Sequence, residues 1–223
     1  MGSAFTVPCA DNRNEVILVG SFLEDDVINH INNNNNIHPI LNYQLPKDIK
    51  VIKFSEFNDT IKENIDLIVV GVSSKGIEWV GEELSKFYNE KTNILLLTKG
   101  LAVIENQFET LADKLEKILK KNGTTNPKIS AVGGPCLASG LANRIKSSVV
   151  LASKNIEMVK EIGKIISTSY YSTEFTEDLI GVEVCAATKN IYSMLIGASE
   201  GLSGNDIDGE IKKKYYLNTC LLY

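Results

Sequence analysis

The sequence has few histidines and cysteines and no surplus of basic residues. It has only two histidines, and its four cysteines contain no CxxC pair, so zinc-ligand spacing is missing. The small number and wide spacing of the cysteines indicate that they are reduced and that the protein is intracellular. The net charge of -5 gives no basic surplus, so nucleic acid is not an expected partner. A small phosphorylated substrate stays open, because it needs only a local cluster of positive charge.

Long apolar runs are missing as well. No run reaches the ~18 residues that suggest a membrane span, and the first residues lack the charged-then-apolar order of a signal peptide. We therefore expect a cytoplasmic protein with no membrane partner. Hydrophobic residues make up 43% and charged residues 23% of the chain, an ordinary balance for a folded protein. Its 223 residues allow one ordinary domain and the start of another.

Short apolar segments alternate with helical patterns along most of the chain. The apolar segments are continuous, which indicates strands covered on both faces, as in a parallel sheet between helices. We predict strands at 15–20, 65–72, 93–98, 129–132 and 148–152, and helices at 24–31, 74–88, 107–121 and 155–166. The alternation predicts an α/β fold with a mostly parallel sheet.

The pattern changes after Thr176. Residues 178–201 are predicted to form one long helix and residues 207–223 another. We therefore place a domain boundary there, with a nucleotide-binding α/β domain at 1–176 and the beginning of a helical domain at 177–223.

Ligands of open parallel sheets bind outside the carboxyl ends of the strands. Segments 73–76, 98–100 and 133–138 follow predicted strands, and we expect them to converge on one edge. Lys99, followed by glycine, suits an anion or a carbonyl group, although a solvated loop lysine is the alternative. The turn at Gly133 and Gly134 exposes backbone N–H groups to a ligand, or is an ordinary turn.

Lys189 lies on a helix that is apolar nearly all round. Its neighbours three and four residues away include no carboxylate: they are Cys185, Ala186, Tyr192 and Ser193. Burial lowers the pKa of a lysine and makes it a usable acid–base group. The alternative is a lysine that extends to the surface. Cys136 and Cys185 are interpreted as small buried side chains that fill space.

Four segments, in this order and spacing, resemble the NAD(P)-dependent glycerol-3-phosphate dehydrogenases. They are Leu97–Leu101, Gly134–Ala138, Ile180–Glu183 and Ala187–Asn190. Residues 2–16 are similar to that family's first helix and second strand. The resemblance implies a Rossmann-type doubly wound, mostly parallel sheet followed by a helical substrate domain. It also implies reversible hydride transfer between NAD(P)H and dihydroxyacetone phosphate, giving glycerol 3-phosphate, with NAD or NADP as cofactor.

The resemblance also implies roles for individual residues. Lys189 would be the acid–base group for the carbonyl oxygen, and Lys99 would bind substrate and cofactor and stabilise negative charge. Three further residues would face the substrate: Gly134, Cys136 and Asn190. Three would contact the cofactor: Gly2, as the last glycine of the phosphate-binding loop, Ser21 and Ala138. A homodimer is compatible with the resemblance, but the sequence does not fix the oligomeric state.

The sequence departs from the family pattern in several places. The first strand and the first two glycines of the phosphate-binding loop are missing, and the family's Arg-Asn pair for the substrate phosphate would lie beyond Tyr223. Cys136 stands where serine or threonine is usual, Gly140 replaces a glutamate, and Thr188 replaces an apolar residue. We expect two unpaired strand edges, and residues 1–223 alone to be poorly stable and inactive, although the parent is an enzyme.

Two other interpretations remain open. Another two-domain dehydrogenase, such as a ketopantoate-reductase-like enzyme, would also place a lysine on the helix after the sheet. A non-catalytic nucleotide-binding remnant would fit the missing segments, but the retained Lys99 and Lys189 oppose it. The choice between NAD and NADP is open too, since Gly20-Ser21-Phe22 offers neither a carboxylate nor an arginine.

Overall fold

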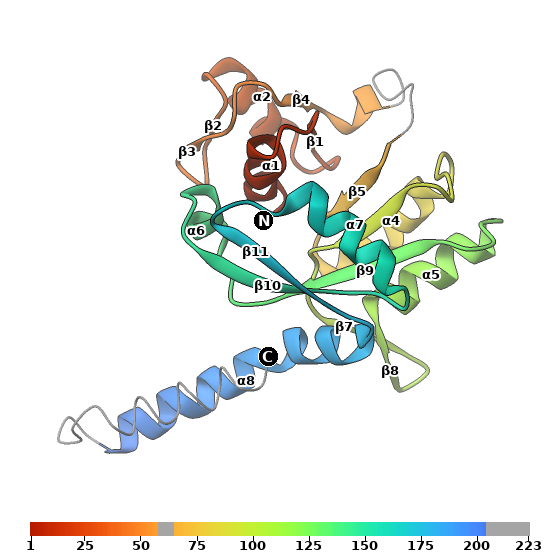
Figure 1. Cartoon of the computed structure of the whole chain (residues 1–223), viewed down its shortest axis with the longest axis vertical. Helices are drawn as coiled ribbons and strands as arrows, with labels where there is room; N and C mark the ends of the chain where they lie inside the picture. Colours follow the sequence, from red (N-terminus) through yellow and green to blue (C-terminus); the bar gives the residue numbers. More distant parts are fainter. Residues whose placement is uncertain (58–64, 204–223) are drawn as a thin grey trace.

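The computed structural model describes residues 1–57 and 65–203. The helix predicted at 207–223 lies outside the described residues. Figure 1 shows an α/β body in which helices pack against a twisted sheet, and a long final helix, α8 (Leu179–Ser203), that extends away from that body. The predicted order, an α/β unit followed by a long helix, is therefore confirmed for the described residues.

Among the described residues, the central sheet has five strands, in the order β11-β10-β9-β6-β5. Three of its four pairings are parallel, and only β9 and β10 run antiparallel. The prediction of a mostly parallel sheet is thus confirmed. The strands are β5 (Leu67–Val70), β6 (Asn93–Leu96), β9 (Lys128–Gly133), β10 (Ser147–Ala152) and β11 (Tyr171–Thr176).

A separate two-stranded parallel sheet lies beside the first. In it β1 (Ile17–Val19) pairs with β4 (Lys50–Ile52). Within the part of the chain that the structure describes, β1 has no other strand partner, and β5 pairs only with β6. The expected pair of open strand edges is therefore present, one on β1 and one on β5.

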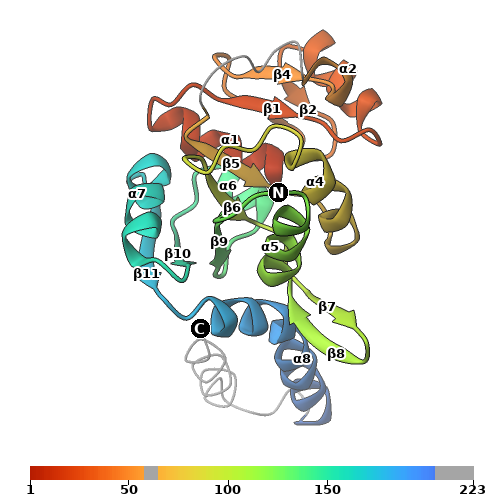
Figure 2. The ribbon, with the colours of Figure 1, turned by 90° about the vertical axis from the view of Figure 1, so that its right-hand side faces the viewer.

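Helices cover both faces of the central sheet, as Figure 2 shows. Strand β6 is buried throughout, and its side chains alternate between two apolar cores: Leu95 enters one core, and Ile94 and Leu96 enter the other. The first core is closed by α1 (Gly2–Asp11), α6 (Ala138–Ala142) and α7 (Ile156–Ile166), and the second by α4 (Ile77–Leu84), α5 (Leu111–Lys121) and the start of α8.

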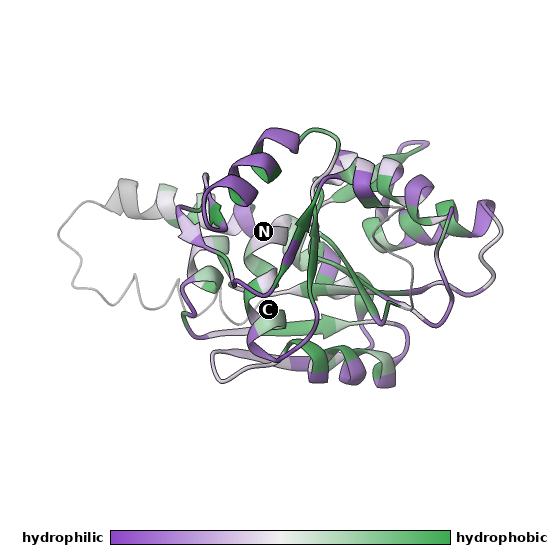
Figure 3. Ribbon diagram, turned by 90° about the horizontal axis from the view of Figure 1, so that it is seen from above, coloured by the Kyte–Doolittle hydropathy of each residue, from purple (hydrophilic) through white to green (hydrophobic). Residues whose placement is uncertain are grey.

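A third core lies under the small sheet. It joins α1 and strands β1 and β4 to α2 (Asp25–Asn33). Coloured by hydropathy, the strands are mostly apolar, while the helices show a polar outer side (Figure 3). The short elements nearby are a hairpin of β2 (Ile37–His38) and β3 (Tyr43–Gln44), and the 3-10 turns η1 (Phe54–Glu56) and η2 (Ser74–Gly76).

Two sequence predictions were wrong in detail. The helix predicted at 107–121 begins only at Leu111, because 107–110 form β8 (Gln107–Thr110), which pairs with β7 (Leu101–Ile104) in a hairpin. Thr110 then caps α5 by accepting a hydrogen bond from the Asp113 backbone. The helix predicted at 74–88 is α-helical only over Ile77–Leu84. Strands β4 and β11 were not predicted at all.

Truncating a buried leucine of the second core should lower the free energy of unfolding strongly. Leu115 on α5 is 0% exposed, so Leu115→Ala should lower the free energy of unfolding by about 2–5 kcal/mol. Leu23 is 79% exposed, and Leu23→Ala should change the free energy of unfolding by less than about 0.5 kcal/mol. Urea unfolding of both variants is the measurement, and equal transition midpoints would contradict the assignment of α5 to the core.

Candidate active site

Three loops meet at the carboxyl end of the sheet. The Thr98 hydroxyl donates a hydrogen bond of 2.7 Å to the Val72 carbonyl, which ties the loop after β6 to the loop after β5. The Lys99 ammonium lies 3.4 Å from the Gly134 carbonyl, which brings in the loop after β9. The convergence expected from the sequence is therefore present.

Lys99 is half-buried in this loop cluster. Burial lowers its pKa, the positive charge of Lys189 lowers it further, and Cys136 acts in the opposite direction. The two lysines, ninety positions apart in the chain (189 − 99), are thus close enough to interact electrostatically. They do not lie on opposite sides of the molecule.

Gly134 makes the turn that carries the substrate-side loop. Its φ is +146°, and an added Cβ would lie 2.9 Å from a Val149 methyl carbon and 3.0 Å from the Ser148 carbonyl oxygen. Only glycine tolerates both conditions. The turn also places Cys136, whose backbone N–H donates to the Gly134 carbonyl over 3.0 Å.

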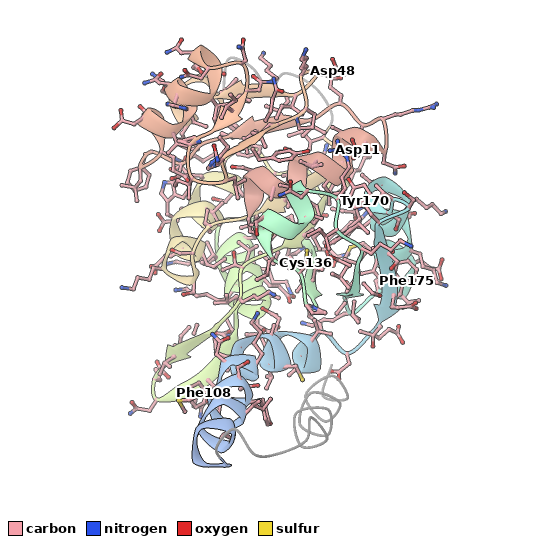
Figure 4. The ribbon with its side chains drawn as sticks, turned by 90° about the vertical axis from the view of Figure 1, so that its left-hand side faces the viewer. Asp11, Asp48, Phe108, Cys136, Tyr170 and Phe175 are labelled. Carbon is pink, nitrogen blue, oxygen red and sulfur yellow. The ribbon has the colours of Figure 1, made fainter. Side chains whose placement is uncertain are left out.

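The Cys136 side chain lies beside this turn, between β9 and α6 (Figure 4). Burial raises the pKa of its thiol, although Ser147 and Lys99 oppose this shift. Cys136 and Cys185 were expected to be buried, and both are instead half-buried. The thiol at position 136 lies near enough to the Lys99 ammonium for each group to affect the pKa of the other.

The first turns of α8 pack closely on the sheet. An added Cβ at Gly133 would lie 2.8 Å from a Val182 methyl carbon, so the absence of a side chain at 133 permits this approach. Glu183 is only 4% exposed, and its carboxylate accepts the backbone N–H groups of Leu111 (3.1 Å) and Ala112 (3.3 Å). Burial raises the pKa of Glu183 to about 7, against the lowering effect of these amides.

Further along, α8 is not covered as the sequence suggested. Ile191, Met194 and Leu195 are each more than half exposed. In the described part of the chain it is the one helix that is long and apolar enough to cross a membrane, by length and composition alone. No such segment was expected from the sequence. The burial of Glu183 against α5 shows instead that the first turns of this helix pack on the α/β body.

A shallow depression lies between the loop after β6 and the start of α8. Lys99 lines it and Glu183 forms part of its wall, whereas half-buried Lys189 and exposed Asn190 lie outside the lining. The lining residues are Thr98, Lys99, Gly100, Ala131, Val132, Val182, Glu183 and Ala186. The structure thus joins Lys99, Gly134 and Cys136 directly, joins Lys189 through its charge, and leaves Asn190 at the surface.

Gly2 lies at the N-terminus of α1, next to the end of β5. A Cβ added at Gly71 would lie 2.9 Å from the Gly2 Cα, so only glycine at position 71 allows this approach. No side chain within the described ranges caps this helix, which leaves its first N–H groups and the positive end of its dipole directed at the carboxyl edge. That arrangement suits a phosphate group.

The other two residues expected at the cofactor lie on separate loops. Ser21 follows β1, and its backbone N–H donates to the Glu24 carboxylate over 2.8 Å. Ala138 is half-buried at the first position of α6, directly after the Cys136 loop. Both positions follow carboxyl ends of strands, as the resemblance implies: Ser21 comes after β1 and Ala138 after β9.

Sequence reasoning missed two features of this edge. One is Glu183, whose partners are backbone groups. The other is an aromatic cluster that follows β1, β4 and β5: the Trp79 ring lies 5.3 Å from Phe22 and 4.9 Å from Phe54, measured between ring centroids. The sign that could have revealed part of the cluster is the position of Phe22 and Phe54 just after strands β1 and β4, whereas Trp79 lies on α4.

The raised pKa of Glu183 predicts how stability depends on pH. The folded state holds this proton more tightly than the unfolded state, so the stabilisation is complete below pH ~4.5 and is lost as pH rises toward 7. A shift of this size corresponds to about 3 kcal/mol. Urea unfolding should show a Glu183→Gln variant losing less stability than the parent between pH 5 and 8, and identical pH profiles would contradict this prediction.

Comparison with known families gives a clear match. The model of the "NAD-dependent glycerol-3-phosphate dehydrogenase N-terminus" matches residues 1–159. An NADP(+)-dependent glycerol-3-phosphate dehydrogenase of Archaeoglobus fulgidus is 29% identical over 201 residues, which are 90% of this chain and 58% of the relative. A glycerol-3-phosphate dehydrogenase [NAD(P)+] of Fusobacterium nucleatum is 30% identical over 177 residues, 78% of this chain and 50% of the relative.

Solved structures share the fold. The glycerol-3-phosphate dehydrogenase of Coxiella burnetii aligns with a TM-score of 0.73 at 22% identity, over 99% of this chain and 65% of that one. The yeast enzyme (Saccharomyces cerevisiae) aligns with a TM-score of 0.74 at 18% identity, over 98% and 65%. The chain thus spans between half and two thirds of the length of these four proteins. It belongs to the NAD-dependent glycerol-3-phosphate dehydrogenase family.

Proposed function

We propose that the protein transfers a hydride reversibly between NAD(P)H and dihydroxyacetone phosphate, giving glycerol 3-phosphate. The observation that carries this proposal is the half-buried Lys99 ammonium at the carboxyl edge of the sheet, 3.4 Å from the Gly134 carbonyl and near enough to Lys189 for that charge to lower its pKa. Two amines at one site suit a carbonyl oxygen that becomes negative as the reaction proceeds. The relatives' names support the same substrate.

The chain has a place for the cofactor. The uncapped N-terminus of α1, beside Gly71, supplies N–H donors for a phosphate group. Phe22 and Trp79, at the same edge, offer aromatic surface for a flat ring. Together with Ser21 and Ala138, Gly2 would hold an NAD or NADP molecule, which supplies the hydride when bound.

The two lysines divide the work on the substrate. Lys99, with its pKa lowered by burial, binds the substrate oxygen and stabilises the charge that develops on it. Lys189 gives a proton to that oxygen in the forward direction and takes it back in the reverse direction. Gly134, Cys136 and Asn190 complete the substrate side, with the Gly134 carbonyl holding the Lys99 ammonium in position.

Several further assignments belong to this proposal. The boundary between the cofactor domain and the helical domain lies at residues 176 and 177, between the end of β11 and the start of α8. The partner is a small phosphorylated substrate, the protein acts in the cytoplasm without nucleic acid or membrane, and a homodimer is the assembly to test.

The proposed function is tested by measuring reduction of dihydroxyacetone phosphate with the protein in the form in which the cell makes it. Loss of nicotinamide absorbance should follow the addition of dihydroxyacetone phosphate to enzyme and NADH or NADPH. Turnover of ketopantoate instead would favour the alternative dehydrogenase, and nucleotide binding without turnover of either would favour a non-catalytic module. That residues 1–223 alone are inactive stays a prediction, which the same assay on the purified chain tests.

A further inference from the structure

Glu183 is a buried carboxylate with an unusual set of partners. It is 4% exposed, and within residues 1–57 and 65–203 no lysine, arginine or histidine forms an ion pair with it. Its Oε1 instead accepts the N–H groups of Leu111 and Ala112, and its Oε2 accepts Ala112 again at 3.3 Å. These are the first two residues of α5.

The N-terminus of a helix partly offsets the cost of burying this carboxylate, although burial still raises its pKa to about 7. The free N–H groups of the first turn and the positive end of the helix dipole both stabilise a carboxylate. The other groups near Glu183 contribute less: the Thr110 hydroxyl also lowers the pKa of Glu183, although it donates to Asp113 as well, and the like charge of Asp113 raises that pKa. The carboxylate therefore fastens α8 to α5 at one point.

This contact joins the two segments that carry the lysines. Lys99 immediately precedes the β7–β8 hairpin, and that hairpin leads directly into α5 at Leu111. Lys189 lies six residues after Glu183 on α8, which is roughly 9 Å along a helix. Because Val182 packs on Gly133 beside it, the same turn of α8 also contacts the strand that leads to Gly134.

We propose that Glu183 is a positioning residue: by binding the N-terminus of α5 it fixes α8 on the sheet, and so sets the separation between the Lys99 and Lys189 ammonium groups. The inference rests on the proposed function in one respect, namely that both amines act on one carbonyl. The geometric part, the dependence of their separation on Glu183, is independent of turnover.

A titration of Lys99 in the whole chain tests this dependence. The amines are ¹³C-methylated, and Lys99→Arg assigns the Lys99 signal. In the parent, Lys189→Gln should raise the pKa of Lys99, because it removes the neighbouring charge. In a Glu183→Gln background, Lys189→Gln should raise the pKa of Lys99 by the same amount, since the amide oxygen still accepts the α5 N–H groups. In a Glu183→Ala background, Lys189→Gln should leave the pKa of Lys99 unchanged.

Ile162→Ala provides the matched control for simple loss of stability. Ile162 is 0% exposed on α7, in the core on the other face of the sheet, so its truncation should leave the effect of Lys189→Gln on Lys99 intact. The positioning role is overturned if Glu183→Ala preserves the coupling, or if Ile162→Ala abolishes it equally. Coupling that is present in the parent and lost in Glu183→Ala supports the positioning role whatever the activity. Failure of the protein as the cell makes it to reduce dihydroxyacetone phosphate refutes the proposed function alone.

Discussion

Replacing Lys189 with methionine should lower kcat for the reduction of dihydroxyacetone phosphate by about 10²- to 10⁴-fold, the usual contribution of a general acid–base group. Methionine has a similar length and an apolar stem, so it fills the half-buried position without the ammonium. Nucleotide affinity should change little, because the residues proposed for the cofactor are on α1, α6 and the loop after β1.

The measurement is steady-state kinetics on the protein as the cell makes it, with NADH titration followed by fluorescence. Lys146, exposed just before β10, gives a matched control, and Lys146→Met should leave kcat unchanged. A second signature concerns Lys99: without the charge at position 189 its pKa should rise toward the ordinary value. A Lys189→Met enzyme that keeps parental kcat would refute the acid–base role.

The inner strands of the sheet could be predicted from the sequence because both of their faces are buried. Segments 93–98 and 129–132 are mainly apolar, and they contain β6 and all but the two end residues of β9. The edge strand β11 lacks this signal. Strand β11 reads Tyr-Ser-Thr-Glu-Phe-Thr and is half polar, because only β10 adjoins it in the sheet.

The antiparallel direction of β10 relative to β9 could not be predicted from the sequence either. Both are apolar, and their antiparallel pairing follows from the path of the chain through α6, which periodicity does not encode. The β7–β8 hairpin was hidden for another reason. Its exposed Phe108 and its polar partners fit the helical pattern of the following residues, and only the positive φ angles of Glu105 and Asn106 show the turn. Figure 4 shows Phe108 on this hairpin, near α8.

The part of the candidate site that could be predicted from the sequence consists of residues whose own side chains suit catalysis. Lys99 after a strand and Lys189 on an apolar helix could be chosen from the sequence, and the structure brings their charges together. Glu183 could not be assigned a role, since its partners are the backbone N–H groups of Leu111 and Ala112, and any residue type supplies those. The partners of a helix N-terminus emerge only from tertiary packing.

Gly134→Ala should produce the largest loss of stability among the site substitutions, about 3 kcal/mol or more. Two costs combine: a side chain at φ +146° is strained, and its Cβ would lie 3.0 Å from the Ser148 carbonyl and the Val149 Cα. Both contacts are backbone atoms of neighbouring β10, so a rotamer change cannot relieve them. The turn would have to shift, taking with it the carbonyl that holds Lys99.

Comparison with Gly123→Ala separates the cost of backbone strain from the cost of the steric contact. The φ of Gly123 is +102°, but an added Cβ would meet nothing within 4 Å, so Gly123→Ala carries the strain alone, about 1–2 kcal/mol. The difference between the two variants in urea unfolding therefore measures the contact with β10. Because Lys99 loses its carbonyl partner only in Gly134→Ala, the affinity for dihydroxyacetone phosphate should fall in that variant and not in Gly123→Ala. Equal stability losses would show that the loop after β9 moves freely away from β10, and the close packing that places Lys99 would then not constrain the site.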